Sequence, residues 1–297
     1  MAWNPTQYLK FGSARMRPAV DLLTRTTCAI GDVTKVKSVL DLGCGTGNMT
    51  ELLCRTFPSA KVKGLDFSAE MIERAVADHS KSDFKDRLSW RIGTAEHESK
   101  CSEEKHDVVF SNAALHWCTG HNELFPNIIK NVVHPNGGVL AVQIPDTRVQ
   151  TSHVLMDTAA FRSGMLNKVK HVRIPRVEQD PAWYFSLLSP MVKEIDMWTT
   201  EYAQQLPSEA PSYADSHEIG ISRHPVLEYT KSTGLLPIIE ALGGEGSTDC
   251  QTYLNEYDRL LYEAYPIVKV NNKCNPTTGG KYITIMPFKR FFLVCKL

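Results

Sequence analysis

The feature that most constrains the fold is a glycine loop that links an apolar segment to an amphipathic one. The segment is VLDLGCGTGNMT, residues 39–50, in which Asp41 precedes glycines at positions 43, 45 and 47. SVLDL, which leads into the loop, has the pattern of a short buried strand, and NMTELLCRTF after it has the pattern of a helix that ends at Pro58. A glycine-rich turn between a strand and a helix is typical of a site where the backbone approaches a ligand.

The flanking sequence alternates between strand and helix patterns as far as Pro145. An earlier helix is predicted to begin at Pro18, because proline is favoured in the first helical turn. Further helices are predicted at 68–78, where Ser68 caps the helix, and at 123–133. Further strands are predicted at 61–67, 88–93, 106–112 and 137–144. Alternating strands and helices predict a parallel sheet with helices on both faces.

Beyond Pro145 this alternation stops. The predicted elements are helices within 151–190, a strand at 193–205, helices near 225–242 and 249–265, and a closing strand at 289–297. A polar, proline-punctuated segment at about 208–222 separates the first of these strands from the helices that follow it. The length of 297 residues suits one large domain, or one domain with a substantial insertion.

The composition narrows the possible partners. Lys plus Arg equals Asp plus Glu at 33 each, so the chain has no net field that would attract nucleic acid or an anionic membrane. No apolar run reaches the roughly 20 residues that span a bilayer, and the first residues lack a signal-peptide pattern. The eight cysteines form no Cys-x-x-Cys pair, which argues against a metal site and favours free thiols. We therefore expect a cytoplasmic protein without bound metal, acting as a monomer.

The glycine spacing restricts the ligand of the loop. In the dinucleotide fingerprint G-x-G-x-x-G the third glycine lies one position later than Gly47, and a phosphate-binding loop needs a lysine where this chain has Asn48 and Met49. The expected ligand carries no phosphate and tolerates Asp41 as a neighbour. S-adenosyl-L-methionine has these properties, with an amino-acid end, a sulfonium cation and a ribose. Asp66, at the end of the next strand, can accept hydrogen bonds from both ribose hydroxyls.

Two sets of motifs carry a family resemblance. VLDLGCGTGNMT followed by GLDFS resembles motifs I and II of class I S-adenosylmethionine-dependent methyltransferases. Nearly the whole chain resembles the trans-aconitate methyltransferase family, through WNPTQYLKF, RMRPAVDLL, SNAALHW, NELFPN, GGVLAVQIPD, LLSP, DMWTTEY, STGLLP and FKRFFLV. The resemblance implies an α/β, Rossmann-like fold with a seven-stranded, mostly parallel sheet, an antiparallel last strand, helices on both faces and a helical cap.

The resemblance also implies a plan for the chain, with a single methyltransferase domain over residues 1–297. Within it, 1–25 form an N-terminal lid over the cofactor and 38–145 form the cofactor-binding core. Residues 151–190 and 207–285 supply the cap and the elements of the acceptor pocket. The cofactor is expected across the carboxyl ends of the first four strands, where the strand order reverses.

By position, the resemblance assigns the contacts of S-adenosyl-L-methionine. Asp41 is expected near its ammonium group, and Tyr8 near its carboxylate or the acceptor. The other expected contacts are Gly43, Cys44, Gly45 and Gly47 for the methionine end, Asp66 and Phe67 for the ribose, Thr94 and Ala95 for the adenine, and Asn112 and Ala113 for the sulfonium. The wider superfamily often has an acid at the position of Thr94, so adenine recognition is expected to rest on backbone groups.

A carboxylate acceptor needs different residues from a hydroxyl acceptor. A carboxylic acid with a pKa of about 4 is already ionised at neutral pH, so methyl transfer to it needs positioning and no general base. The candidates for holding the acceptor are Arg17, His116, Trp117, Gln143, Tyr202 and Arg290. His116 is a donor to the acceptor, a base for a hydroxyl acceptor, or a structural histidine bonded to backbone. The other five also have structural alternatives, as core aromatics, an exposed helix start or polar strand ends.

Two positions depart from the family pattern and leave the acceptor open. Leu236 stands where the family has an arginine and Gln204 where it has a histidine, so two groups that can bind an anion are missing. The predicted activity is O-methylation of a carboxylate of a small organic acid, with trans-aconitate as the leading acceptor. The alternatives are a terpenoid or fatty-acid carboxylate, a small hydroxyl compound, or a cofactor-binding module without activity. An NAD-dependent dehydrogenase would need the later third glycine, and a nucleic-acid methyltransferase a basic surface.

Overall fold

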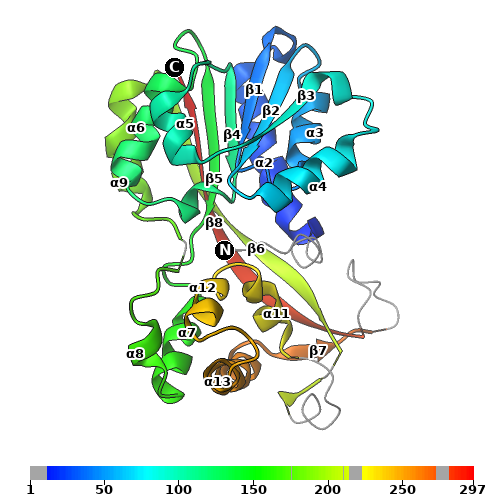
Figure 1. The fold of residues 1–297 in the computed structure, drawn as a ribbon, viewed down its shortest axis with the longest axis vertical. Coiled ribbons are helices and arrows are strands. Elements are labelled where there is room, and N and C mark those ends of the chain that lie inside the picture. The colour runs from blue at the N-terminus through cyan, green and yellow to red at the C-terminus, as the bar shows by residue number, and fades with distance from the viewer. Residues whose placement is uncertain (1–11, 175, 210, 214–222, 272–280) are drawn as a thin grey trace. The chain divides into compact units, whose positions relative to one another are not determined.

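The computed structural model describes residues 12–174, 176–209, 211–213, 223–271 and 281–297 (Figure 1). The chain divides into two compact units. As far as they are described, the core unit comprises Met1–Pro145, Arg176–Thr200 and Arg290–Leu297, and the second unit comprises Asp146–Pro175 and Glu201–Lys289. Each unit is thus assembled from segments that are far apart in the sequence.

The strands form one sheet whose order reverses beside β1. Their bounds are β1 (Ser38–Leu42), β2 (Lys61–Asp66), β3 (Leu88–Ile92), β4 (Val108–Asn112), β5 (Val139–Pro145), β6 (Glu194–Ser208), β7 (Ile267–Lys269) and β8 (Tyr282–Lys296). The order is β3-β2-β1-β4-β5-β8-β6, and β7 pairs with β8 outside this path. The strands β1 to β5 pair in parallel, whereas β8 is antiparallel to β5. The predicted mostly parallel sheet with an antiparallel closing strand is confirmed.

Helices cover the parallel strands on both sides. In the core unit they are α2 (Gly12–Ile30), α3 (Asn48–Thr56), α4 (Ala69–His79), α5 (Ala95–Cys101), α6 (His121–Asn131) and α9 (Pro181–Leu188), with short 3-10 turns at Val33–Lys35, Lys85–Arg87, Leu115–Trp117 and Ser189–Met191. In Figure 1, α3 and α4 lie on one side of the strands and α5, α6 and α9 on the other. All residues of β5 and residues 39–42 of β1 are buried, as expected for strands covered on both faces.

Aromatic packing fixes the last strand of the core unit against its neighbours. Tyr184 of α9 is fully buried, and its ring lies 5.3 Å from that of Phe125 and 5.2 Å from that of Phe291. Trp198 of β6 stacks on Phe292 of β8 at 4.7 Å. Burial of one such side chain stabilises a fold by about 1.5–3 kcal/mol. These contacts hold β8 in register beside β5, where two predicted acceptor residues lie.

The start of the first helix differs from the prediction. Helix α2 begins at Gly12, so Pro18 lies inside it and not in its first turn. Proline cannot donate the backbone hydrogen bond that a helix interior requires. Pro18, Ala19 and Leu22 are buried together on one face, however, and tertiary packing of this kind supplies most of the stability of a helix. Helix α5 was not predicted either, because AEHESKC has no apolar stripe.

The second unit is built around two packed helices. Its helices are α7 (Thr151–Arg162), α8 (Leu166–Val169), α11 (Pro225–Lys231), α12 (Leu236–Ala241) and α13 (Thr248–Ala264). The Tyr257 hydroxyl of α13 donates to the Ser152 carbonyl of α7 at 3.0 Å, and the Ser152 N–H donates to the Tyr265 hydroxyl at 2.9 Å. Within the described ranges, none of the helices combines the length and the hydropathy needed to cross a bilayer. The roles predicted for 1–25, 151–190 and 207–285 stay predictions.

Candidate cofactor site

The glycine loop joins β1 to α3 at the edge where the strand order reverses. The N–H groups of Gly43 and Cys44 both donate to the Leu65 carbonyl of β2, at 2.7 and 3.0 Å. Gly43, Gly45 and Gly47 have φ angles of 84°, 54° and 83°, which residues with a side chain rarely adopt. The three glycines therefore let the chain turn sharply while the loop stays tied to β2.

A side chain at each of the three glycines would meet different surroundings. A Cβ at Gly43 would lie 2.1 Å from the Cβ of Ala114, and one at Gly47 would lie 2.4 Å from the Trp90 ring. A Cβ at Gly45 would have no neighbour within 4 Å among the described residues. Packing of the protein itself thus requires Gly43 and Gly47, whereas Gly45 leaves open a space that a ligand can fill.

Asp66 holds the loop from the end of β2. Its Oδ2 accepts a hydrogen bond from the Gly45 N–H at 2.9 Å, and its Oδ1 accepts one from the Ser68 N–H at 3.0 Å. Burial raises the pKa of Asp66, and the backbone N–H groups of Ser68, Gly45 and Phe67 partly offset that rise. Each carboxylate oxygen can accept more than one hydrogen bond, so Asp66 retains acceptors for the hydroxyl groups of a ligand.

Asp41 is buried at the end of β1. Its side chain is 1% exposed, and its Oδ2 accepts a hydrogen bond from the Thr50 hydroxyl at 2.7 Å. Burial raises the pKa of Asp41 to about 7; the Thr50 bond opposes this rise and the charge of Asp66 adds to it. A cation close to such a carboxyl stabilises its charged form. Asp41 is therefore suited to a ligand group that carries positive charge.

The Cys44 thiol in the loop is not activated as a nucleophile or as a metal ligand. Burial raises its pKa above the usual range, and the charges of Asp41 and Asp66 raise it further. A thiol that stays protonated is a poor nucleophile and a poor metal ligand. All cysteines within the described ranges are free thiols, and no group of three or more His, Cys, Asp or Glu side chains there is arranged to hold a metal ion.

The residues after β3 and β4 complete this edge of the sheet. Thr94 caps α5 by accepting a hydrogen bond from the His97 N–H at 3.1 Å. Ala113 has a φ of 52°, the one positive φ outside glycine in the described residues. Its N–H donates to the Gln143 carbonyl at 2.9 Å, which helps to hold this strained turn. The turn places Ala114 at the position where Gly43 leaves room for it.

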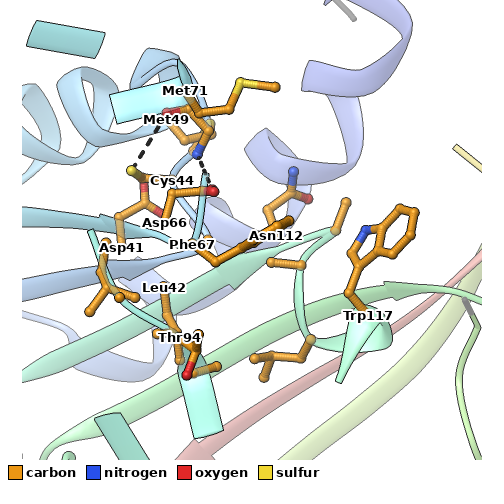
Figure 2. A pocket seen from close by; sticks show the side chains of 18 of the residues that line it. Asp41, Leu42, Cys44, Met49, Asp66, Phe67, Met71, Thr94, Asn112 and Trp117 are labelled. Atoms are coloured by element: carbon orange, nitrogen blue, oxygen red, sulfur yellow. Dashed lines mark hydrogen bonds between the residues drawn. The ribbon is translucent and has the colours of Figure 1, made fainter. Parts of the chain in front are cut away.

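These segments surround a cavity of about 390 Å³ (Figure 2). The predicted cofactor contacts that line it are Asp41, Gly43, Cys44, Gly45, Asp66, Phe67, Thr94, Ala95, Asn112 and Ala113. In Figure 2, Asp66 and Trp117 lie on opposite sides of Asn112. Gly47 lies at the base of the loop, outside the lining, and Tyr8 lies outside the described residues. The structure thus gathers nearly all the predicted cofactor residues around one cavity.

The predicted acceptor residues are more scattered. Trp117 lines the cavity, and the exposed Arg17 follows the lining residue Met16 on α2. His116 is buried beside Trp117, with ring centroids 5.4 Å apart, and does not line the cavity. Tyr202 is buried within the second unit.

Gln143 and Arg290 lie in a row with Asn112 on one face of the sheet, and we call these three residues the polar row. The strand register pairs Asn112 with Gln143, and Gln143 with Phe292. Arg290 precedes Phe292 by two residues and therefore projects to the same face as Gln143. Gln143 is 1% exposed, and neither of its amide atoms has a hydrogen-bond partner in the described part of the chain. The same holds for Oδ1 of Asn112. Buried amide groups without partners indicate a place for a ligand or water.

Several lining residues were missed by the sequence prediction. They are Met16, Leu42, Thr46, Asn48, Met49, Leu65, Met71, Gly93, Glu96, Ala114, Leu115 and Cys118. The helical spacing of Met71 predicts a core residue, so nothing in the sequence distinguishes it as a lining residue. One indication pointed weakly toward Glu96 as a lining residue. The wider superfamily often has an acid at the position of Thr94, and Glu96 is an acid two residues later in the sequence.

Comparison with known proteins decides the family. A model described as a methyltransferase domain matches residues 34–204. Trans-aconitate 2-methyltransferase from Shigella dysenteriae serotype 1 is 34% identical over 296 residues, which cover 99% of this chain and 98% of that protein. The chain belongs to the trans-aconitate methyltransferase family. The enzyme of the same name from Escherichia coli O139:H28 is 33% identical with the same coverage. The chain is therefore an S-adenosylmethionine-dependent methyltransferase, as its motifs predicted.

Solved structures agree on the fold. A putative sarcosine dimethylglycine methyltransferase from Galdieria sulphuraria superposes with a TM-score of 0.51 at 13% identity, covering 94% of this chain and 85% of that one. Coclaurine N-methyltransferase, solved with N-methylheliamine and SAH, superposes with a TM-score of 0.50 at 14% identity, covering 94% and 72%. At such identities the likeness concerns the fold alone, and it confirms the predicted Rossmann-like architecture.

The cavity has the chemistry that S-adenosylmethionine requires. Gly45 leaves space beside the loop, Asp41 offers a carboxyl whose pKa of about 7 responds to a nearby cation, and Asp66 retains hydrogen-bond acceptors. Met49 and Met71 add flexible apolar surface to the lining. The residues present therefore fit the cofactor, and the assignment of each contact stays a prediction.

Proposed function

We propose that this methyltransferase forms a methyl ester on a carboxylate of a small organic acid, with trans-aconitate as the leading acceptor. The relatives named trans-aconitate 2-methyltransferase support this acceptor. The observation that carries the proposal is the polar row, which leads from the cofactor cavity at Asn112, past the unpartnered amide of Gln143, to the buried guanidinium of Arg290.

In the proposed reaction the protein has to hold the acceptor carboxylate in line with the methyl group of the cofactor. When bound, S-adenosylmethionine supplies an electrophilic methyl group on a sulfonium. A carboxylate acceptor with a pKa of about 4 is ionised at neutral pH, so no side chain has to remove a proton from it. Holding two reactants in line can supply roughly 7–11 kcal/mol of the barrier. The position of His116 outside the cavity lining fits a reaction without a general base.

In this proposal two members of the polar row, Arg290 and Gln143, and the cavity residue Trp117 each have their own task. Arg290 binds a carboxylate of the acceptor, because a guanidinium can donate two parallel hydrogen bonds to it. Gln143 fixes the orientation of the acid through its amide, which is otherwise left without a partner in the described chain. Trp117 forms an apolar wall that keeps water from the reacting groups. Without a fixed cation such as Arg290, burying an acid anion would be costly.

A less highly charged acid is the second candidate acceptor. Gln204 is buried, and neither of its amide atoms has a partner among the described residues. It stands where the family has a histidine, and Leu236 stands where the family has an arginine. Neutral side chains at both positions favour an acceptor with fewer carboxylates than trans-aconitate.

The test is mass spectrometry of the products. The protein is incubated with S-adenosylmethionine and, separately, trans-aconitate, other di- and tricarboxylic acids, apolar monocarboxylates and small hydroxyl compounds. The expected product is a monomethyl ester of a di- or tricarboxylic acid, which alkaline hydrolysis returns to the free acid. Methylation of hydroxyl compounds alone, or no product from the panel, would refute the proposal.

Substitution in the polar row tests the acceptor site. Arg290→Gln is expected to raise KM for the acid at least tenfold and to leave KM for S-adenosylmethionine unchanged, since a hydrogen bond to a charged group is worth about 1.5–3 kcal/mol. Arg74→Gln is the matched control, because Arg74 is exposed and pairs with Asp78 at 2.7 Å on α4. Equal KM values for the acid in both variants would show that Arg290 does not bind the acceptor.

A further inference from the structure

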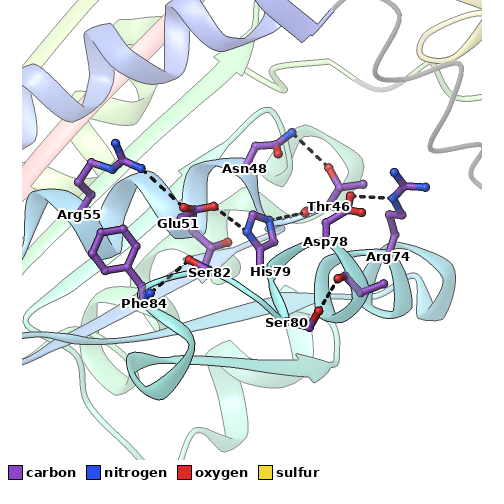
Figure 3. Close-up of polar contacts among 12 residues, drawn as sticks. Thr46, Asn48, Glu51, Arg55, Arg74, Asp78, His79, Ser80, Ser82 and Phe84 are labelled. Carbon is purple, nitrogen blue, oxygen red and sulfur yellow. Dashed lines mark hydrogen bonds and ion pairs between the residues drawn. The ribbon is translucent and has the colours of Figure 1, made fainter.

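A histidine that no motif singles out contacts the glycine loop (Figure 3). His79 is the last residue of α4 and is 7% exposed. Its Nε2 lies 3.1 Å from the carbonyl oxygen of Thr46 in the loop, and its Nδ1 lies 2.8 Å from Oε2 of Glu51 in the first turn of α3. One side chain thus contacts both the loop and the helix that follows it.

Both partners of the His79 ring can only accept hydrogen bonds. A carbonyl oxygen carries no proton, and an ionised carboxylate carries none either. A neutral imidazole has a single N–H, so one of the two contacts would bring lone pairs together. Both contacts are hydrogen bonds when both ring nitrogens are protonated. The geometry of the two contacts thus corresponds to an imidazolium ring paired with the Glu51 carboxylate.

The surroundings of the ring agree with a positive charge. His79 ends α4, and the dipole of a helix favours a cation at its C-terminus. The Trp90 ring of β3 stacks on His79 at 5.5 Å and shields one face of it. The other charged side chains on the two helices that meet here are Glu51 and Arg55 of α3, 3.7 Å apart, and Glu70, Glu73, Arg74 and Asp78 of α4, of which the last two lie 2.7 Å apart. Among them, Glu51 is the one bonded to the ring.

His79 and Asp66 hold the backbone of two adjacent residues of the loop. Asp66 accepts a hydrogen bond from the Gly45 N–H at 2.9 Å, and the His79 ring reaches the carbonyl of the next residue, Thr46. A Cβ on Gly47 would lie 3.0 Å from Cδ2 of His79, so the ring also packs against the last glycine. The loop is therefore anchored on both sides of the place where Gly45 leaves space for a ligand.

We propose that His79 is a positioning residue for cofactor binding. As an imidazolium paired with Glu51, it donates to the Thr46 carbonyl and holds the glycine loop in the shape that receives S-adenosylmethionine. This inference rests on the proposed placement of the cofactor in the cavity beside the loop. His79 does not line that cavity, so its effect reaches the cofactor through the loop.

Two substitutions separate the two contacts of the ring. The amide nitrogen of glutamine can reach the position of Nε2, so His79→Gln keeps a donor for Thr46 and loses the contact with Glu51. The amide nitrogen of asparagine lies near the position of Nδ1, so His79→Asn keeps the contact with Glu51 and loses the one with the loop. Both variants remove the ring and its charge. If the ring had only a structural role, both variants would lose cofactor affinity to the same extent.

Calorimetry with S-adenosylmethionine measures the difference. His79→Asn is expected to bind the cofactor about tenfold more weakly than wild type, the effect of one lost hydrogen bond, and His79→Gln to stay within about threefold. In kinetics, His79→Asn should raise KM for S-adenosylmethionine and leave KM for the acid unchanged. Asp78→Asn, an exposed change on the same helix, is the control and should bind like wild type. Equal weakening in the two His79 variants would overturn the proposal.

Nuclear magnetic resonance of the ring nitrogens gives a second test that needs no cofactor. The wild-type spectrum is expected to show both nitrogens of His79 protonated, and the spectrum of Glu51→Gln recorded under the same conditions is expected to show a neutral ring. A neutral ring in wild type, or an imidazolium that persists in Glu51→Gln, would overturn the proposal even if the His79 variants do not fold. A separate measurement tests the proposed placement of the cofactor. If adding S-adenosylmethionine leaves the amide signals of Gly45 and Asn112 unchanged, that placement is wrong, whatever the state of the His79 ring.

Discussion

Replacing Asp41 with asparagine is expected to stabilise the folded protein at neutral and alkaline pH while weakening its affinity for the cofactor. The Asp41 side chain is buried at the end of β1 and accepts a hydrogen bond from the Thr50 hydroxyl. Asparagine has nearly the same shape and can accept that bond through its carbonyl oxygen. It brings no charge into the interior, however, so the substitution separates the shape of the residue from its charge.

The expected gain follows from the pKa of Asp41. Burial raises this pKa from 3.8 to about 7, and each pH unit of such a difference corresponds to about 1.36 kcal/mol. The charged carboxylate therefore destabilises the folded state by up to about 4 kcal/mol above pH 7. Burial of the asparagine amide costs about 1–3 kcal/mol in its place, which leaves a net gain of about 1–3 kcal/mol.

The sign of the pH dependence gives the sharper test. Because the folded pKa is raised, the unfolded chain loses its proton first, and the cost of Asp41 grows as the pH rises from about 4 to about 7. Urea unfolding of wild type and Asp41→Asn at pH 5 and pH 8 should show the larger advantage for the variant at pH 8. Asp78→Asn, an exposed carboxylate, controls for the change in net charge. A variant less stable than wild type at pH 8, or an advantage independent of pH, would refute the reasoning.

The same substitution has an opposite effect on binding. A cationic group of the cofactor stabilises the charged form of Asp41, so the affinity of wild type should increase as the pH rises through about 7. Asp41→Asn should bind more weakly at pH 8 and lack this increase. Calorimetry at pH 6 and pH 8 measures both effects, and identical pH profiles for the two proteins would contradict a contact between Asp41 and the cation.

Three further predictions address other parts of the chain. Gly45→Ala should bind S-adenosylmethionine at least tenfold more weakly, because its Cβ enters the open space beside the loop, and should lose about 1–2 kcal/mol of stability, the cost of a side chain at a φ of 54°. Gly43→Ala should lower the unfolding temperature further, because its Cβ also meets the Cβ of Ala114 at 2.1 Å. Asp66→Asn should weaken cofactor binding in calorimetry, and unchanged affinity would contradict the ribose contact. Burial lowers the pKa of His224 to about 4, so its contribution to stability, up to about 3 kcal/mol, is present above about pH 6.5 and lost as the pH falls toward 4. Urea unfolding at pH 7 and pH 4.5 should therefore show a smaller acid loss in His224→Gln than in wild type, and equal losses would show that His224 does not contribute.

The sequence was most informative where local spacing determines the structure. The glycine loop and the acids at the ends of β1 and β2 lie within 30 residues of one another, and their order along the chain predicts their place in a βαβ unit. The alternation of strands and helices predicted the parallel sheet for the same reason. Nearly all the residues that were expected to contact the cofactor consequently line one cavity.

The sequence was least informative where contacts depend on register or on distant segments. Gln143 and Arg290 share a face only because β8 pairs with β5 in one particular register. His79 of α4 contacts Glu51 of α3, and the sequence gives no sign that these two helices bring the residues together. A histidine in the last turn of a helix is common, because the helix dipole favours a cation there, so its position alone does not indicate a role. Pro18 shows the converse, because its local preference for a first turn was outweighed by burial of the α2 face.

The place of β8 in the sheet has a consequence for synthesis of the protein. β5 ends at Pro145, whereas the residues that pair with it begin at Arg290. While the ribosome produces the intervening stretch, the hydrogen-bonding edge of a mostly apolar strand stays open, and such an edge can recruit a neighbouring nascent chain. We therefore expect newly made polypeptides to need protection by chaperones until residues 290–296 have been added.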